Sequence, residues 1–338
     1  MDLPTIWFIL IAVLWTGYLV LEGFDFGVGM LLPFLGRNDT ERRTMINTIG
    51  PVWDGNEVWL LTAGGATFAA FPMWYATMFS GFYLPLLLIL LALIIRVVSF
   101  EWRGKIDDER WRRRSDLALT VGSWVPAVLW GVAFGNLVRG VQLDADHQYV
   151  GTVFDLLNPF ALLAGATTGL IFLTHGAVFI ALKTDGDIRR RAGAVAVPAA
   201  VATLVVAGAF ALWTQVAYSE AGWTWAATAV AAVALLGLVA AARARREGWA
   251  FLASAVAIIA AVVLIFGSMY PAVMPALDEA NSLTVHNAAS ATYTLTIMTW
   301  VAVALTPLVL LYQGWTYWVF RKRITAEQIP AHTGLTFR

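Results

Sequence analysis

Nine stretches of about 20 or more mostly apolar residues follow one another along this 338-residue chain. They cover residues 5–33, 48–71, 74–98, 116–138, 155–182, 192–217, 223–242, 249–271 and 289–320. A helix needs about 20 apolar residues to cross the hydrocarbon core of a bilayer. None of the stretches has the alternation of a membrane β-barrel strand, so their backbone groups must be satisfied within helices. The sequence therefore predicts an all-α integral membrane protein with nine transmembrane helices.

The composition excludes several other classes of protein. Hydrophobic residues make up 59% of the chain and charged residues 13%, whereas soluble domains are about 45–50% apolar and about 25% charged. These fractions exclude a disordered chain, a nucleic-acid binder and a soluble enzyme. The chain has no Cys, which excludes disulfides, thiolate metal sites, iron–sulfur clusters and c-type haem attachment.

The distribution of basic residues predicts how the helices are oriented. One side of the predicted topology, including the C-terminal segment, holds 21 of the 22 Lys and Arg residues, and Arg139 is the exception. The opposite loops hold acids such as Asp144, Glu220 and Asp278. Because cytoplasmic loops are enriched in Lys and Arg, we expect the N-terminus outside and the C-terminus in the cytoplasm. An odd number of spans requires the same arrangement.

Four carboxylates lie within the first two predicted spans: Glu22 and Asp25 in the first, and Asp54 and Glu57 in the second. Because no small-residue cleavage site follows the first span, we expect a retained helix and not a signal peptide. The i, i+3 spacing places each pair on one helix face, in the cytoplasmic half of the membrane. A charged residue at the bilayer centre costs at least about 2.5–3.5 kcal/mol. We therefore expect these acids to face the bundle interior, share hydrogen bonds, pair with a base such as Arg96, or be protonated.

Two interpretations of these acids remain open. Ionisable residues inside a membrane are functional by default, which favours a proton path that opens to the cytoplasm. Alternatively, the acids only tie helices together, because small residues typical of tight helix packing surround them. These small residues are Gly23, Gly27, Gly29, Gly55, Gly64 and Gly65.

Histidine is scarce in the predicted spans, and only His175 lies within one. A haem held between helices by two His side chains needs two that face each other, and a lone buried His is more often a hydrogen-bonded packing residue. We therefore expect no haem in this chain. The sequence also has no His/Glu cluster typical of a di-iron or zinc site.

Several motifs resemble one family of membrane proteins. The runs at 23–29 (GFDFGVG), 36–43 (GRNDTERR) and 53–60 (WDGNEVWL) are similar to subunit II of cytochrome bd quinol oxidases. Shorter similarities follow at 79–83 (FSGFY), 131–136 (GVAFGN), 157–160 (LNPF) and 298–303 (MTWVAV). The resemblance runs along nearly the whole chain, and the Trp-Asp-Gly-Asn run inside a membrane helix is its most specific part.

The resemblance implies a complex with a larger subunit I, which carries two b-type haems, haem d and the quinol-oxidising loop. Together the subunits oxidise quinol near the outer face of the bacterial cytoplasmic membrane. They reduce O2 to water with protons taken from the cytoplasm and do not pump protons. Some members also hold a structural quinone, and a small accessory subunit is a further partner to consider.

The family architecture is nine helices in two four-helix bundles plus one peripheral helix. On this chain it implies a single membrane domain over 1–338, with a first bundle at 1–138 that contains the acids. A second, apolar bundle follows at 155–271, then a ninth helix at 289–320 and a cytoplasmic tail at 321–338.

The resemblance also implies roles for single residues on the proton path. Asp54 matches a carboxylate assigned to the cytoplasmic proton path of the family, and Asp25 is a neighbouring acid. Trp53 and Trp59 match the tryptophans that flank this carboxylate, near regions linked to proton and oxygen access.

Four further positions are compared with the family in the same way. Arg96 and Glu101 match the basic–acidic pair that ends the third helix. Glu57 and His175 stand where the family tolerates amides, so their titration is not essential to the family pattern.

Two alternatives to an oxidase subunit are a proton-coupled secondary transporter and a scaffold without chemistry. Transporters often have internal repeats with interrupted helices at matching positions in both halves. The cluster of Gly and acidic residues in the first two spans has no counterpart in the fifth and sixth, which argues against a transporter. The sequence leaves the choice between ubiquinol and menaquinol open.

Overall fold

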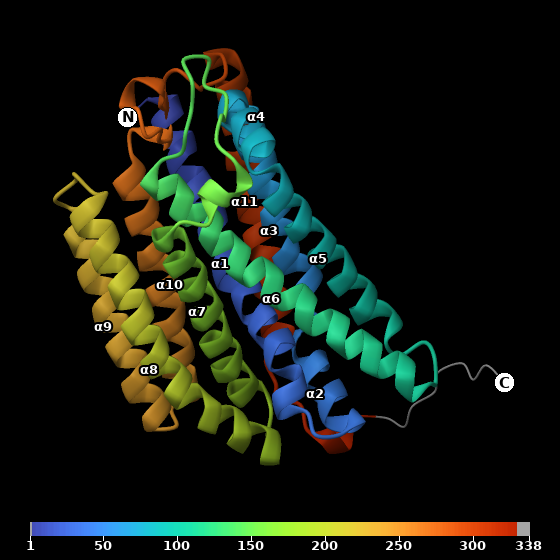
Figure 1. The fold of residues 1–338 in the computed structure, drawn as a ribbon. Coiled ribbons are helices and arrows are strands. Elements are labelled where there is room, and N and C mark those ends of the chain that lie inside the picture. The colour runs from blue at the N-terminus through green and yellow to red at the C-terminus, as the bar shows by residue number, and fades with distance from the viewer. Residues whose placement is uncertain (1, 330–338) are drawn as a thin grey trace.

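The computed structural model describes residues 2–329, in which eight helices are long and apolar enough to cross a membrane. They are α1 (Leu3–Leu35), α5 (Tyr83–Trp102), α6 (Glu109–Arg139), α7 (Pro159–Lys183), α8 (Gly186–Ala217), α9 (Thr224–Arg243), α10 (Glu247–Met269) and α11 (Thr292–Val319). Their axes run along one common direction in Figure 1, which confirms an all-α membrane protein. Residues 330–338 of the predicted tail lie outside the described residues.

The second predicted stretch, 48–71, corresponds to α3 (Trp53–Ala70), which is not among these eight helices. The first two turns of α3 carry Asp54, Asn56 and Glu57, and these polar side chains lower its mean hydropathy. The helix nevertheless packs along α1 and also contacts α11. A count of nine spans therefore depends on α3, whose polar start separates it from the other eight.

The third predicted stretch, 74–98, is divided into two helices. The first, α4 (Pro72–Gly81), ends at Phe82, whose backbone is not helical (φ −100°, ψ 23°), and α5 begins directly after it. The second helix continues to Trp102, so Arg96 lies more than one turn before its end. Of the basic–acidic pair expected at the end of this helix, only Glu101 lies in its last turn, because the helix continues beyond the apolar stretch.

The basic end of the bundle, defined as the end that holds the α5–α6, α7–α8 and α9–α10 connections, also carries a helix that the sequence did not predict. This helix, α2 (Asp39–Ile49), is held by ion pairs from Arg42 to Asp116 at 2.9 Å and from Glu41 to Arg191 at 2.6 Å. Partial burial alone would raise the pKa of Glu41, but hydrogen bonds from Arg191 and a backbone N–H outweigh it and lower that pKa. The α1–α3 connection is thereby fixed to α6 and α8.

Two longer connections close the opposite end of the bundle. The strand β1 (Ala272–Met274) pairs in antiparallel fashion with β2 (Leu283–Thr284), and a bridge between Val141 and Ala276 joins the two connections. Three short 3-10 helices complete the described chain: η1 (Val153–Leu156), η2 (Glu279–Asn281) and, after α11, η3 (Ala326–Gln328).

The helices α1 and α7 form the centre of the bundle. The first contacts α3, α6, α10 and α11, and the second contacts α6, α8 and α10 as well as α1. Their crossing depends on Gly27 and Gly176, because a Cβ on either would overlap the backbone of the other helix. By contrast, α11 lies at the edge, with Leu295 as its one buried residue.

The six glycines near the acids fall into two groups. A Cβ on Gly23, Gly27 or Gly29 would overlap atoms of α6 or α7, so tight packing is confirmed there. The three glycines of α3 would meet no atom within 4 Å, so the expectation of tight packing is wrong for them within the described chain. These are Gly55, Gly64 and Gly65.

Candidate functional site

Four helices build one buried polar cluster, which comprises Glu22 and Asp25 of α1, Asn56 of α3, Arg96 of α5 and Tyr317 of α11. The first four side chains are fully buried, and Tyr317 is half-buried. Asp25 lies ten residues before the end of α1, which is about 15 Å along the helix axis. The polar cluster therefore lies inside the bundle, nearer its basic end.

Arg96 and Glu22 form an ion pair in the interior of the bundle. The guanidinium carbon lies 4.8 Å from the ring centroid of Phe26 and 5.1 Å from that of Phe100, which suits a cation–π contact. Beyond this ion pair and the neighbouring Asp25, the carboxylate oxygens of Glu22 and the three Arg96 nitrogens have no well-aligned hydrogen-bond partner within residues 2–329. Buried polar atoms are nearly always hydrogen-bonded to protein or to ordered water. The guanidinium can therefore donate to further partners, and the carboxylate can accept from them.

Asn56 connects α1 to α11 through its amide. Its Nδ2 donates to Oδ2 of Asp25 at 2.7 Å, and its Oδ1 accepts from the hydroxyl of Tyr317 at 2.6 Å. The same oxygen accepts from Nε2 of Gln313 at 3.3 Å, and Gln313 in turn accepts from Nε1 of Trp59 at 2.8 Å. Trp59 thus belongs to a hydrogen-bonded chain that reaches Asp25.

Asn56, Gln313 and Tyr317 are not among the candidate site residues predicted from the sequence, although Asn56 belongs to the Trp-Asp-Gly-Asn run. Those candidates are mainly charged groups that could carry protons, and amides and phenols do not titrate near neutral pH. The available signal was the position of Asn56 between two acids in a stretch otherwise read as membrane-spanning.

The structure does not bring Asp54 into the polar cluster. Its side chain is exposed in the first turn of α3, whereas Trp53 beside it stacks on Phe100 with the ring centroids 5.6 Å apart. Of the four acids expected in the interior, Glu22 and Asp25 are there and Asp54 is not. The reason is helical geometry: Asp54 and Asn56 are two positions apart, a rotation of about 200° that places them on nearly opposite sides of α3.

The two remaining candidate acids are not members of the polar cluster. Glu57 is half-buried, and its charge interacts with those of Arg96 and Asp54. Glu101 is exposed in the last turn of α5 and belongs to the surface of the basic end.

His175 of α7 has partners for both ring nitrogens. Its Nδ1 lies 2.6 Å from Oγ of Ser254, its Nε2 lies 3.1 Å from the carbonyl oxygen of Val20, and its ring stacks on Phe251. A neutral imidazole with its proton on Nε2 satisfies both partners and leaves no nitrogen for a haem iron. These residues do not fit a haem, and within residues 2–329 no group of three His, Cys, Asp or Glu residues could hold a metal ion.

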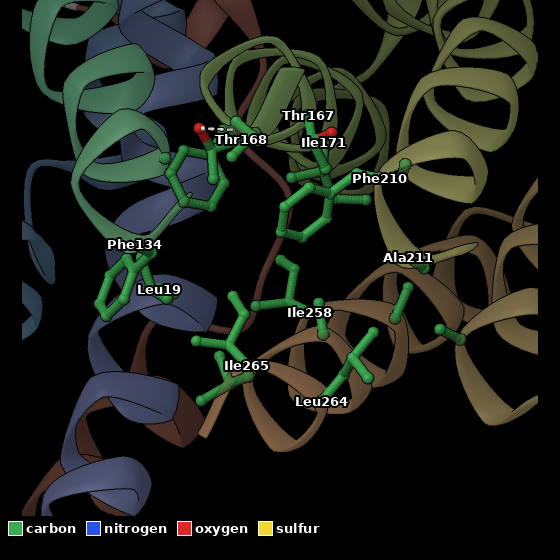
Figure 2. A pocket seen from close by; sticks show the side chains of 18 of the residues that line it. Leu19, Phe134, Thr167, Thr168, Ile171, Phe210, Ala211, Ile258, Leu264 and Ile265 are labelled. Atoms are coloured by element: carbon green, nitrogen blue, oxygen red, sulfur yellow. Dashed lines mark hydrogen bonds between the residues drawn. The ribbon is translucent and has the colours of Figure 1, made fainter. Parts of the chain in front are cut away.

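An apolar cavity of about 60 Å³ lies among α1, α6, α7, α8, α9 and α10. Figure 2 shows Phe134, Phe210 and Ile258 around it, together with Thr167 and Thr168. Both threonine hydroxyls donate to carbonyl groups of their own helix. A buried water needs two to four polar partners, and this apolar lining does not offer them. Small-molecule pockets measure about 300–1,000 Å³, so this cavity does not fit a quinone.

Comparisons with known proteins agree with one another. Residues 3–320 match the family described as cytochrome bd terminal oxidase subunit II. Cytochrome bd ubiquinol oxidase subunit 2 of Bacillus subtilis (strain 168) is 44% identical, over 97% of this chain and 98% of that one. Cytochrome bd-I ubiquinol oxidase subunit 2 of Escherichia coli (strain K12) is 42% identical, over 97% of each chain. The solved bd oxidase from Geobacillus thermodenitrificans shares the fold, with a TM-score of 0.76 at 19% identity, over 95% of this chain and 100% of that one.

Proposed function

This chain belongs to the cytochrome bd terminal oxidase subunit II family, and we propose from this membership that it is the haem-free subunit of a respiratory quinol oxidase. Its partner is a larger subunit I, in which two b-type haems and haem d supply the redox chemistry of quinol oxidation and O2 reduction. Because O2 reduction to water consumes protons, a buried reaction site needs a route for them. We propose that this subunit provides that route and stabilises subunit I.

The proposed placement follows the distribution of charge. The basic end faces the cytoplasm of a bacterial inner membrane, and the N-terminus faces outward. In this arrangement α3 is the ninth span, residues 1–138 and 155–271 form the two bundles, and α11 is the peripheral helix. Family membership leaves the alternative of a proton-coupled transporter without support.

The observation that supports a proton route is the set of unsatisfied atoms in the polar cluster. Beyond their mutual ion pair, the fully buried Glu22 and Arg96 have no well-aligned hydrogen bond in residues 2–329, and Oδ1 of Asp25 has none either. Water is the usual partner of such atoms, and carboxylates joined by water can relay protons. In this proposal Asp54 and Glu57 form the entrance at the basic end, and Asp25 and Glu22 form the buried section.

The outer face of α3 is the proposed contact with subunit I. Along it lie Asp54, Gly55 and Gly65 beside exposed apolar side chains such as Leu61 and Phe68. A carboxylate and bare glycine backbone suit a protein neighbour better than lipid tails. A groove of about 480 Å³ between α3 and the α4–α5 pair continues this surface.

Asp25→Asn and Asp54→Asn variants of the assembled complex test the proton route. Asn at position 25 can still accept the hydrogen bond from Asn56, so the change removes a titratable group with little loss of packing. We expect O2 consumption to fall roughly 100-fold or more, with the haem absorbance spectrum unchanged. Glu220→Gln, an exposed carboxylate at the opposite end, is the matched control and should consume O2 at the parental rate.

Each outcome of this experiment has a clear meaning. Full O2 consumption by both aspartate variants would overturn the proton route through this subunit. Loss of haem absorbance together with activity would indicate that the acids hold the complex together instead of carrying protons.

A further inference from the structure

A groove of about 650 Å³ opens at the basic end between the α7–α8 and α9–α10 helix pairs. Five arginines and two carboxylates line it, together with small apolar residues of α7, α8 and α10. We propose that this groove binds the headgroup and the upper acyl chains of an anionic phospholipid. The proposal is independent of the oxidase function, since it needs only this groove and a membrane around it.

Three of the arginines have no carboxylate partner. Arg189 pairs with Glu247 at 2.8 Å, and Arg190 pairs with Asp187, which lies outside the groove, at 2.9 Å. The remaining three lie in and beside the α9–α10 turn, are exposed, and form no salt bridge within the described chain. They are Arg243, Arg245 and Arg246.

The local backbone concentrates these charges. Two residues separate α9 from the turn residue Arg246, and Arg245 between them adopts a left-handed conformation with φ 54°. The turn is therefore tight, and three guanidinium groups follow one another over four residues. Arginine donates two parallel hydrogen bonds to a phosphate, which a lipid phosphodiester can accept.

The wall beneath the arginines is apolar and lacks bulk. Val178, Ala194 and Ala250 contribute to it, and a Cβ on Gly193 would meet no atom within 4 Å. Trp249, close to the turn, is 65% exposed, as is typical of tryptophan at headgroup depth. A free anion would use the arginines but not this wall, whereas a phospholipid uses both.

The membrane position agrees with this ligand. Basic pockets between transmembrane helices on the cytoplasmic side bind anionic headgroups, and each Lys or Arg near the surface strengthens the attraction. The groove lies between such helices, at the end where the other basic connections gather. The unpaired arginines, the apolar lining beneath them and the place at the basic end between membrane helices therefore favour an anionic lipid over a protein partner.

Native mass spectrometry of the delipidated complex, with vesicles of phosphatidylglycerol or phosphatidylcholine added back, tests the proposal. We expect phosphatidylglycerol to be retained and phosphatidylcholine to be lost. Replacing Arg243, Arg245 and Arg246 by Gln should weaken phosphatidylglycerol retention by roughly fivefold per arginine, or on the order of 100-fold together. Gly193→Leu keeps every charge but fills the groove, and it should weaken retention as well.

Matched controls separate a site from general surface charge. Replacing Arg110, Arg113 and Arg114 by Gln removes the same charge from the α5–α6 side of the basic end and should leave retention unchanged. If both triple variants lost phosphatidylglycerol equally, or if Gly193→Leu retained it as the parent does, the proposal that this groove is the binding site would be wrong. Displacement of the lipid by millimolar inorganic phosphate would identify a free-anion site, and equal retention of phosphatidylcholine would remove the role of charge.

Discussion

Glu22 is the only carboxylate that touches Arg96 among the described residues, and both side chains are fully buried. Removing one partner of a buried ion pair leaves the other charge without compensation, which costs about 3–5 kcal/mol. We therefore expect Glu22→Gln to lower the free energy of unfolding of the complex by about that amount, measured by thermal or chemical denaturation. Glu220→Gln is the control and should change it by less than about 0.5 kcal/mol. A stable Glu22→Gln variant would mean that Glu22 is not the charge that compensates Arg96.

The sequence identified some members of the polar cluster and missed others for a physical reason. Glu22, Asp25 and Arg96 stand out because charged residues in apolar stretches are expensive. Asn56 and Tyr317 carry no charge, and their contribution depends on a contact between α3 and α11, which lie more than 200 residues apart. Spacing along one helix cannot predict such a contact.

At the level of elements, the α1–α7 crossing requires glycine at the two positions where the helix backbones touch. A methyl group on Gly27 would overlap the carbonyl of Phe172 and the backbone of Gly176, and backbone atoms cannot rotate away. We expect Gly27→Ala to lower the free energy of unfolding of the complex by about 1–3 kcal/mol or more, seen as a lower melting temperature. Gly208→Ala in α8, where a Cβ meets no atom within 4 Å, should melt at the parental temperature or above. Equal melting of both variants would show that the two helices can move apart at little cost.

Hydropathy predicted where apolar helices lie but not how the backbone behaves within or between them. The stretch 74–98 is apolar throughout, so the division at Phe82 leaves no trace in a hydropathy profile. The helix α2 was missed because it is polar and lies outside the membrane-length stretches. Its signals were local instead: Asn38 accepts a hydrogen bond from the N–H of Glu41 as a helix N-cap does.

At the level of the whole molecule, two outer surfaces differ in chemistry. Along its membrane length the exposed side of α9 carries Ala, Val, Leu and Trp side chains and a single glycine, Gly237, without an acid or a hydroxyl group, which suits lipid. The exposed side of α3 mixes large apolar side chains with Asp54, Thr62 and glycines. Lipid tails cannot hydrogen-bond to a carboxylate, and exposed glycines allow a neighbouring helix to approach closely, so this second surface favours a protein neighbour.

A photo-crosslinking amino acid, p-benzoylphenylalanine, placed at single positions can separate these two surfaces, because it reacts with C–H bonds of whatever lies next to it. Leu61 of α3 and Val233 of α9 are matched positions, with exposed fractions of 72% and 70%. In the assembled complex we expect the side chain at position 61 to cross-link to subunit I on irradiation, because α3 is the proposed contact. The same side chain at position 233 should cross-link to lipid and not to subunit I, and the mass of the products distinguishes the two results. A position-61 variant that cross-links to lipid alone would place subunit I elsewhere. The open glycines of α3 would then face lipid, and the proton entrance at Asp54 would lose its connection to the partner that consumes protons.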